Sequence, residues 1–319
     1  MPVNQKQLTN QVVMVHPTDF GFNEQTGVDN EFQNKPQAED HSKITKQACH
    51  EFEQSVLALE SQGIGVQVLN KSPQQQRVPD AVFPNNWFST RANGELLIYP
   101  MKTANRQEEV QIDNLSKTLN SSGFGISKII DLREEFGNDQ ILEGTGSLIF
   151  HHPSNRLFAA ISERCLAQPL KRFAEFFEYE LIAFDTLSSN SKPVYHTNVL
   201  MSCGENFAVI TESVIHSKDR KRVLDSLYDT VEDVVIISEQ QMAEGFCGNV
   251  LQLCDQQQQP VLVMSHSAFK GFSNPQKKIL ERHADFAIFN IDTIESVGGG
   301  SARCMIAENF LPKVSAKKA

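Results

Sequence analysis

The sequence contains no apolar run long enough to cross a membrane. No window of the 319 residues approaches the ~18 apolar residues of a membrane span, and residues 1–11 contain no apolar core of signal-peptide length. We therefore expect a cytoplasmic protein that does not bind membranes.

An excess of positive charge is also missing. The 29 lysines and arginines are scattered and are outnumbered by 39 aspartates and glutamates, which gives a formal net charge of -10. Proteins that bind nucleic acid usually need a basic face that neutralises phosphates. We therefore expect neither DNA nor RNA as a partner.

Paired cysteines and phosphate-binding glycine motifs are absent too. The six cysteines form no CxxC pair, so the sequence predicts neither a disulfide framework nor a zinc site. No G-x-G-x-x-G follows an early strand and no G-x-x-x-x-G-K-[ST] occurs, which argues against a doubly wound nucleotide-binding sheet. Because the histidines and cysteines also lack metal-ligand spacing, we expect no metal and no organic cofactor.

What is present is an internal repeat in a chain of ordinary globular composition. Five amphipathic stretches predict helices, each followed by a short apolar run that predicts a buried strand. The helices are expected at residues 44–59, 108–119, 166–177, 220–227 and 275–282, and the strands at 65–69, 128–132, 180–184, 234–237 and 286–289. Hairpin-like segments with turns such as Asn93-Gly94 lie between them. The period of roughly fifty to sixty residues is typical of repeat architectures.

The repeat predicts strand–turn–strand–helix–strand units in a single α/β domain that covers residues 1–319. A first strand at residues 12–17 and a last strand near residues 301–307 could pair and close a ring, which would remove exposed sheet edges. Residues 19–40 and 71–79 are polar and are expected to be loops. Long loops in compact domains are often functional lids.

Four segments place polar residues beside glycine or proline at equivalent positions of successive repeats. Equivalent strand starts converge on the axis of a ring with quasi-fivefold symmetry, so residues far apart in sequence can share a site. The segments are FPNNW (83–87), LEGTGS (142–147), YHTN (195–198) and GGGSARCM (298–305).

Cys304, His196 and Glu143 lie in these segments and together suggest thiol chemistry. A free thiol has a pKa of about 8.5 and needs a stabilising neighbour to react at neutral pH. His196 could protonate a leaving amine and then activate water, and Glu143 could orient the imidazole or bind substrate nitrogens. Each residue alone has a plainer explanation, as a buried cysteine, a core histidine or a strand-end carboxylate. Only the combination is specific.

At these residues the sequence resembles the amidinotransferase (pentein) superfamily, which includes arginine deiminases, agmatine deiminases, dimethylargininases and arginine:glycine amidinotransferases. GGGSARCM is similar to the glycine-rich segment that carries the nucleophilic cysteine in arginine deiminases. LEGTGS resembles their EGG-type segment and YHTN their histidine–x–aspartate segment. The resemblance covers essentially the whole chain and implies a five-bladed ββαβ propeller, with Cys304 as nucleophile, His196 as acid–base and Glu143 as its carboxylate partner.

Two positions depart from the superfamily pattern. Asn86 and Asn198 stand where guanidine-modifying members have aspartates that clamp a cationic guanidinium. An amide carries no charge, and charge-assisted hydrogen bonds are roughly twice as strong as neutral ones. The asparagine pair therefore favours a neutral ureido group, although Asp80 could retain one carboxylate. Asn86, Asn198, Asp80 and Phe83 are the expected substrate contacts.

The N-terminal segment MVHPTDFGFNEQTGVDNEFQ (14–33), together with the asparagine pair, most resembles the citrulline-utilisation hydrolases of this superfamily. His16 stands where family members usually have arginine, which leaves the contact to a substrate carboxylate unassigned. Asn23 and Gln33 are candidate lid contacts.

The sequence therefore predicts a hydrolase of an arginine-related amino acid, with citrulline as the leading substrate. Ornithine would leave first, and water would then hydrolyse the S-carbamoyl intermediate on the enzyme. The products would be ornithine, ammonia and carbon dioxide. An arginine deiminase, a dimethylargininase or an amidinotransferase is the alternative, and a non-catalytic binding protein of the same fold is less favoured. The outer helices could support a homodimer.

Overall fold

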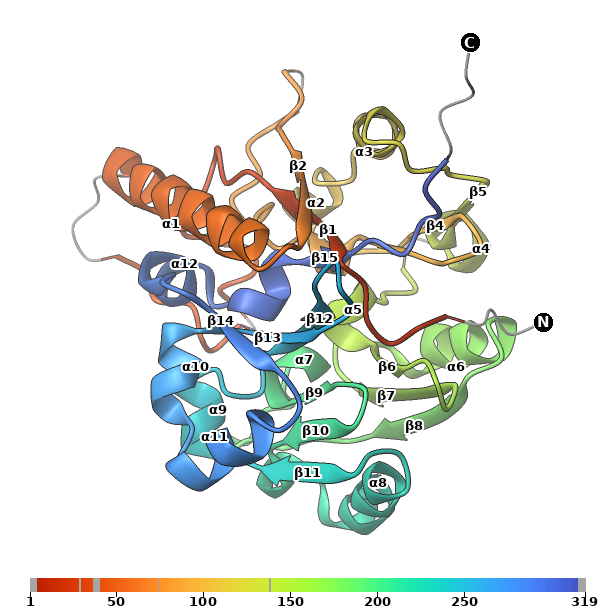
Figure 1. The fold of residues 1–319 in the computed structure, drawn as a ribbon, viewed down its shortest axis with the longest axis vertical. Coiled ribbons are helices and arrows are strands. Elements are labelled where there is room, and N and C mark those ends of the chain that lie inside the picture. Colours follow the sequence, from red (N-terminus) through yellow and green to blue (C-terminus); the bar gives the residue numbers. More distant parts are fainter. Residues whose placement is uncertain (1–4, 29, 37–40, 74, 138, 315–319) are drawn as a thin grey trace.

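Five three-stranded sheets make up the computed structural model, which describes residues 5–28, 30–36, 41–73, 75–137 and 139–314. Figure 1 shows the sheets around the middle of the molecule, with the longer helices on the outside. In spatial order the sheets are β15 (Ala307–Glu308), β1 (Gln11–Val15) and β2 (Gly65–Leu69); β3 (Phe88–Thr90), β4 (Glu95–Ile98) and β5 (Lys128–Asp131); β6 (Ile149–His151), β7 (Arg156–Ala160) and β8 (Glu180–Phe184); β9 (Met201–Cys203), β10 (Phe207–Ile210) and β11 (Asp233–Ile236); and β12 (Leu251–Cys254), β13 (Pro260–Ser265) and β14 (Asp285–Phe289).

Every sheet has the same topology. The middle strand pairs antiparallel with one neighbour and parallel with the other, and a helical crossover precedes the parallel strand. The crossover helices are α1 (His41–Ser61), α3 (Ile112–Ser121), α6 (Ala167–Phe176), α8 (Ser217–Tyr228), and the pair α10 (His266–Gly271) and α11 (Asn274–Leu280). The predicted α/β five-bladed ββαβ propeller is thereby confirmed.

Burial patterns explain why these segments become strands. The middle strands are almost entirely buried, as in β10, where all four residues are buried. The strands that follow the crossover helices alternate between buried and more exposed residues, as in β8 and β14. Alternation of this kind belongs to a strand with one face against the core.

The chain ends close the ring. Strand β15 pairs antiparallel with β1, and Val13 lies opposite Ala307. The predicted pairing of first and last strands is confirmed, but the predicted last strand at 301–307 is wrong in extent. Residues Ala302–Met305 form the 3-10 turn η3, because the backbone N–H of Cys304 bonds the carbonyl of Ser301 (2.9 Å) instead of a neighbouring strand.

The other polar segments also form short helical turns in front of the hairpins, where the sequence suggested strand starts. They are η1 (Pro84–Asn86), α5 (Gly144–Ser147) and α7 (Thr197–Leu200). The turn α5 contacts both η1 and α7, and η1 contacts η3. The turns therefore bring the expected site residues together.

The remaining helices are short. They are α2 (Ala104–Gln107), α4 (Leu132–Phe136), η2 (Glu212–Val214), α9 (Glu239–Ala243) and α12 (Asp292–Gly298). The helix expected at 108–119 begins only at Ile112, because residues 103–110 form a separate turn that includes α2. Within the described residues, no helix has both the length and the apolar character needed to span a membrane.

The two expected loops contain no helix or strand in their described parts, and residues 29, 37–40 and 74 lie outside the described residues. The first loop runs over α12. The N–H of Asn34 bonds the carbonyl of Ser296 (2.8 Å), and Gln33 Nε2 bonds the carbonyl of Gly298 (3.0 Å). This loop therefore covers the glycines that precede Cys304.

Candidate active site

A small cavity is lined by most of the expected site residues. Cys304, His196, Asn86, Asp80 and Phe83 line it together with Gly298–Gly300. Its volume of about 20 Å³ holds little more than one water molecule.

Two neutral amides contact the Cys304 sulfur. Asn198 Nδ2 donates to it at 3.4 Å and Asn249 Nδ2 at 3.2 Å, and the side chain of Cys304 is buried. Asn198 is a contact expected from the sequence, whereas Asn249 is not. Asn86 lies beside Gly146. A Cβ built at Gly146 would stand 2.3 Å from Asn86 Oδ1 and 3.1 Å from His196 Nδ1.

His196 and Glu143 form a buried pair. The His196 Nε2 to Glu143 Oε2 distance is 2.7 Å. The second oxygen of Glu143, Oε1, accepts the backbone N–H of Lys102 at 2.9 Å, and Arg164 Nη1 donates to Oε2 at 3.4 Å. His196 and Glu143 are therefore hydrogen-bonded to each other, and their catalytic roles stay a prediction.

The pKa of each member of this pair lies below its ordinary value, for different reasons. Burial would raise the pKa of Glu143, but the charge of Arg164, the hydrogen bond from His196 and the charge of Arg106 lower it well below its ordinary value. Burial also lowers the pKa of His196, and the bond to Glu143 offsets only part of this effect. Glu143 is therefore ionised and His196 neutral near pH 7.

The hydrogen bond to an ionised carboxylate fixes the tautomer of His196. Nε2 must carry the proton that it donates to Glu143, which leaves the lone pair of the neutral ring on Nδ1. Nδ1 is the nitrogen that faces Gly146. His196 can therefore accept a proton through Nδ1 while Glu143 stabilises the resulting cation.

Asp80 connects the covering loop to the cavity. Its Oδ2 accepts hydrogen bonds from Asn23 Nδ2 (2.7 Å) and Thr26 Oγ1 (2.8 Å), whereas its Oδ1 has no hydrogen-bond partner in the described chain. Burial raises the pKa of Asp80 despite the nearby charge of Arg106. Of the two candidate lid residues, Asn23 holds Asp80 and Gln33 holds Gly298.

Several cavity neighbours are not among the site residues expected from the sequence. Arg106, Arg164 and Tyr195 line the cavity, and the two arginines carry no sequence signal that marks them. Asn249 could have been found, because CGNV (247–250) precedes the fifth hairpin as YHTN precedes the fourth. Among the described residues, no three His, Cys, Asp or Glu side chains come together as a metal site.

Known structures share this fold. The N-terminal domain of ArgZ, a cyanobacterial arginine dihydrolase solved with its substrate, aligns with a TM-score of 0.69 at 16% identity, covering 93% of this chain and 96% of that chain. The dimethylarginine dimethylaminohydrolase of Pseudomonas aeruginosa, solved with citrulline, aligns with a TM-score of 0.65 at 13% identity, covering 95% and 99%. No curated protein sequence matches the chain.

A comparison of the sequence with protein-family profiles assigns the family of this chain. The profile described as "N,N dimethylarginine dimethylhydrolase, eukaryotic" matches residues 16–311, and the chain belongs to this family. It is therefore a hydrolase of carbon–nitrogen bonds other than peptide bonds, in a cysteine-dependent class that acts on arginine-related guanidino compounds.

Proposed function

We propose that this protein hydrolyses the guanidino group of arginine or an N-methylated arginine through a covalent intermediate on Cys304. The sulfur attacks the central guanidino carbon, and ammonia or a methylamine leaves. Water then attacks the same carbon, the sulfur–carbon bond breaks, and citrulline is released. His196 and Glu143 transfer protons in this scheme, and Asp80 and Asn198 bind the guanidinium.

His196 and Glu143 provide the proton transfers of this scheme. Nδ1 of neutral His196 accepts the thiol proton and passes it to the leaving amine. It later accepts a proton from the attacking water and returns it to the sulfur as the sulfur–carbon bond breaks. Glu143 is ionised and stabilises the imidazolium while it exists.

One observation carries the choice of a guanidino group. Asp80 Oδ1 and Asn198 Oδ1 are buried acceptors with no hydrogen-bond partner in the described chain, and Asn198 touches the Cys304 sulfur. Buried polar atoms are normally satisfied, so unpaired acceptors point to a ligand that donates. A guanidinium offers only N–H donors, whereas a ureido group also brings a carbonyl oxygen that needs a donor.

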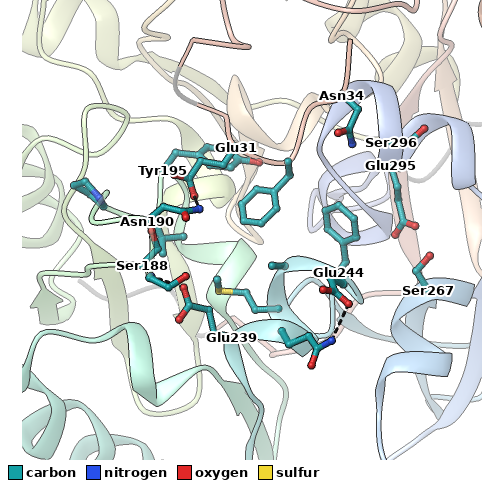
Figure 2. Close-up of a pocket in the computed structure, with 18 of the residues that line it drawn as sticks. Glu31, Asn34, Ser188, Asn190, Tyr195, Glu239, Glu244, Ser267, Glu295 and Ser296 are labelled. Atoms are coloured by element: carbon teal, nitrogen blue, oxygen red, sulfur yellow. Dashed lines mark hydrogen bonds between the residues drawn. The ribbon is translucent and has the colours of Figure 1, made fainter. Parts of the chain in front are cut away.

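A large acidic cavity beside the site supports a cationic substrate. It has a volume of about 760 Å³, and Tyr195 lines both this cavity and the small one that contains Cys304. Figure 2 shows carboxylates on several of its walls. A concave surface of one sign concentrates ligands of the opposite sign. Its acidic residues are Glu31, Glu239, Glu244, Asp292 and Glu295, and its described lining contains no lysine or arginine.

Hydrolysis of citrulline, the substrate that the sequence analysis placed first, is the second candidate. The observation in its favour is that the sulfur is contacted by the amides of Asn198 and Asn249, whose N–H groups suit a ureido oxygen. The two reactions could follow one another, because hydrolysis of arginine to citrulline and then of citrulline to ornithine would use the same cysteine. The family and the name of ArgZ, an arginine dihydrolase, favour a guanidino compound as the entry point.

Product analysis tests the proposal. The protein is incubated separately with arginine, monomethylarginine, dimethylarginine and citrulline, and ornithine, citrulline, ammonia and methylamines are quantified. We expect citrulline and an amine from at least one guanidino substrate, lost in Cys304→Ser and retained in the control Cys203→Ser. Ornithine from citrulline alone would favour the second candidate, and a new amidino compound when an acceptor amine is added would indicate a transferase. No product from any substrate would contradict both candidates.

A further inference from the structure

The amide of Asn249 is locked in one orientation against the Cys304 sulfur. The side chain is almost fully buried, and its Oδ1 accepts the backbone N–H of Arg303 at 3.1 Å. Its Nδ2 donates to the carbonyl of Asn198 at 2.8 Å and to the sulfur at 3.2 Å. Turning the amide over would break the bonds to Arg303 and Asn198, so an N–H faces the sulfur.

The backbone that carries Asn249 is fixed as well. The N–H of Asn249 bonds the carbonyl of Phe246 at 2.8 Å, and Phe246 itself has a positive φ of 51°. A Cβ at Gly248 would stand 2.3 Å from the carbonyl oxygen of Val199, so only glycine allows this turn to approach α7 so closely. Asn249 is therefore presented to the sulfur from a rigid turn.

We propose that Asn249 is a positioning residue that stabilises the thiolate of Cys304 and holds the sulfur in place. Its Nδ2 lies closer to the sulfur than its Oδ1 does, so the contact with the thiolate is the tighter one. The thiol can donate to Oδ1 at 3.5 Å, and the thiolate accepts from Nδ2 at 3.2 Å. Hydrogen bonds that are made to the charged form of a group favour that form. This inference rests on the proposed role of Cys304 as the nucleophile.

Substitution of Asn249 by aspartate tests the N–H donor with little change in shape. The carboxylate can still accept the N–H of Arg303, but it places an anion where the N–H donated to the sulfur. The charged and titratable groups that line the same cavity, Asp80, Arg106, Arg164, Tyr195 and His196, are unchanged by this substitution.

The readout is the rate at which iodoacetamide alkylates Cys304 as a function of pH, with the modified peptide identified by mass spectrometry. We expect alkylation of Asn249→Asp near pH 7 to be about tenfold slower or more, and the midpoint of the pH profile to rise by roughly one unit or more. The plateau rate at high pH, which reports access to the sulfur, should stay close to that of the wild type.

A matched control is Asn309→Asp. Asn309 is equally buried, its Oδ1 accepts the N–H of Leu311 (3.1 Å) and its Nδ2 donates to Gln67 (3.2 Å), so its setting is similar but remote from Cys304. This variant should keep the wild-type pH profile. If Asn249→Asp does not fold, Asn249→Ser removes the amide without adding charge, and its midpoint should still rise.

Three results distinguish whether Asn249 stabilises the thiolate of Cys304. A raised midpoint in folded Asn249→Ser, which adds no charge, with an unchanged Asn309 control, supports the inference. A wild-type midpoint in folded Asn249→Asp or Asn249→Ser overturns it while leaving Cys304 as the nucleophile. A wild-type Cys304 that is not alkylated at any pH would contradict both this inference and the proposed function.

Discussion

At the scale of single residues, the described side chains that hydrogen-bond the sulfur of the candidate nucleophile are neutral amides. Asn85 belongs to the same network as Asn198 and Asn249. In the amide orientation that satisfies its neighbours, Asn85 donates to the carbonyl of Cys304 (2.9 Å) and accepts from Asn198 Nδ2 (3.2 Å). Three asparagines from three repeats therefore support one cysteine.

The first prediction concerns Glu143. Glu143→Gln removes the anion that balances Arg164 and a protonated His196, so we expect kcat to fall about 100-fold or more. Unfolding at neutral pH should require about 3 kcal/mol less, since a buried ion pair is broken. Kinetic assays and urea denaturation measure the two effects.

The pH dependence of that stability difference has a definite sign. Folding lowers the pKa of Glu143 from 4.5, so its ionisation stabilises the fold above about pH 4.5 and this contribution is lost as pH falls further. The gap between wild type and Glu143→Gln should therefore shrink below that pH. The control Glu163→Gln alters an exposed carboxylate that pairs with Lys102, and it should change neither kcat nor stability appreciably. A gap that widens in acid would contradict the assignment.

At the scale of elements, short helical turns in front of the hairpins position the site. Gly144 begins α5 with a φ of +37°, and a Cβ there would stand 2.4 Å from the carbonyl oxygen of Asn85. The turn that follows Glu143 can therefore pack against η1 only because position 144 has no side chain.

A pair of glycine substitutions tests this packing. Gly123 also has a positive φ, +82°, but a Cβ there would meet nothing within 4 Å. Gly123→Ala should cost about 1 kcal/mol from backbone strain alone and leave activity intact. Gly144→Ala should cost more and lower kcat, because η1 and α5 must separate. Thermal unfolding and kinetics of both variants check this, and equal losses of stability with full activity would contradict it.

The sequence predicted the regular elements better than the turns. Strands such as β2 and β8 were placed correctly because β-branched and aromatic runs follow amphipathic helices. Residues 302–305 were assigned to a strand and form a turn, because their local hydrogen bonds prevail over apolar character. Local bonds of this kind leave little trace in hydrophobic patterning.

At the scale of the whole molecule, the ring explains why residues from four repeats could be predicted to share one site. The convergence of Glu143, His196 and Cys304 follows from the repeat together with the superfamily resemblance. The contacts of Asp80 with Asn23 and Thr26 could not be predicted, because they depend on how an irregular loop folds over the ring. The buried charges of Arg106 and Arg164 likewise become visible only in three dimensions.

The central claim is that Cys304 bonds covalently to the guanidino carbon during turnover. It is tested most directly by quenching the wild-type protein in acid while it converts its guanidino substrate, and by measuring the mass of the peptide that contains Cys304. We predict an increase equal to the substrate minus the departed amine, absent in Cys304→Ser. An adduct on another residue, or one that forms equally in Cys304→Ser, would contradict the claim.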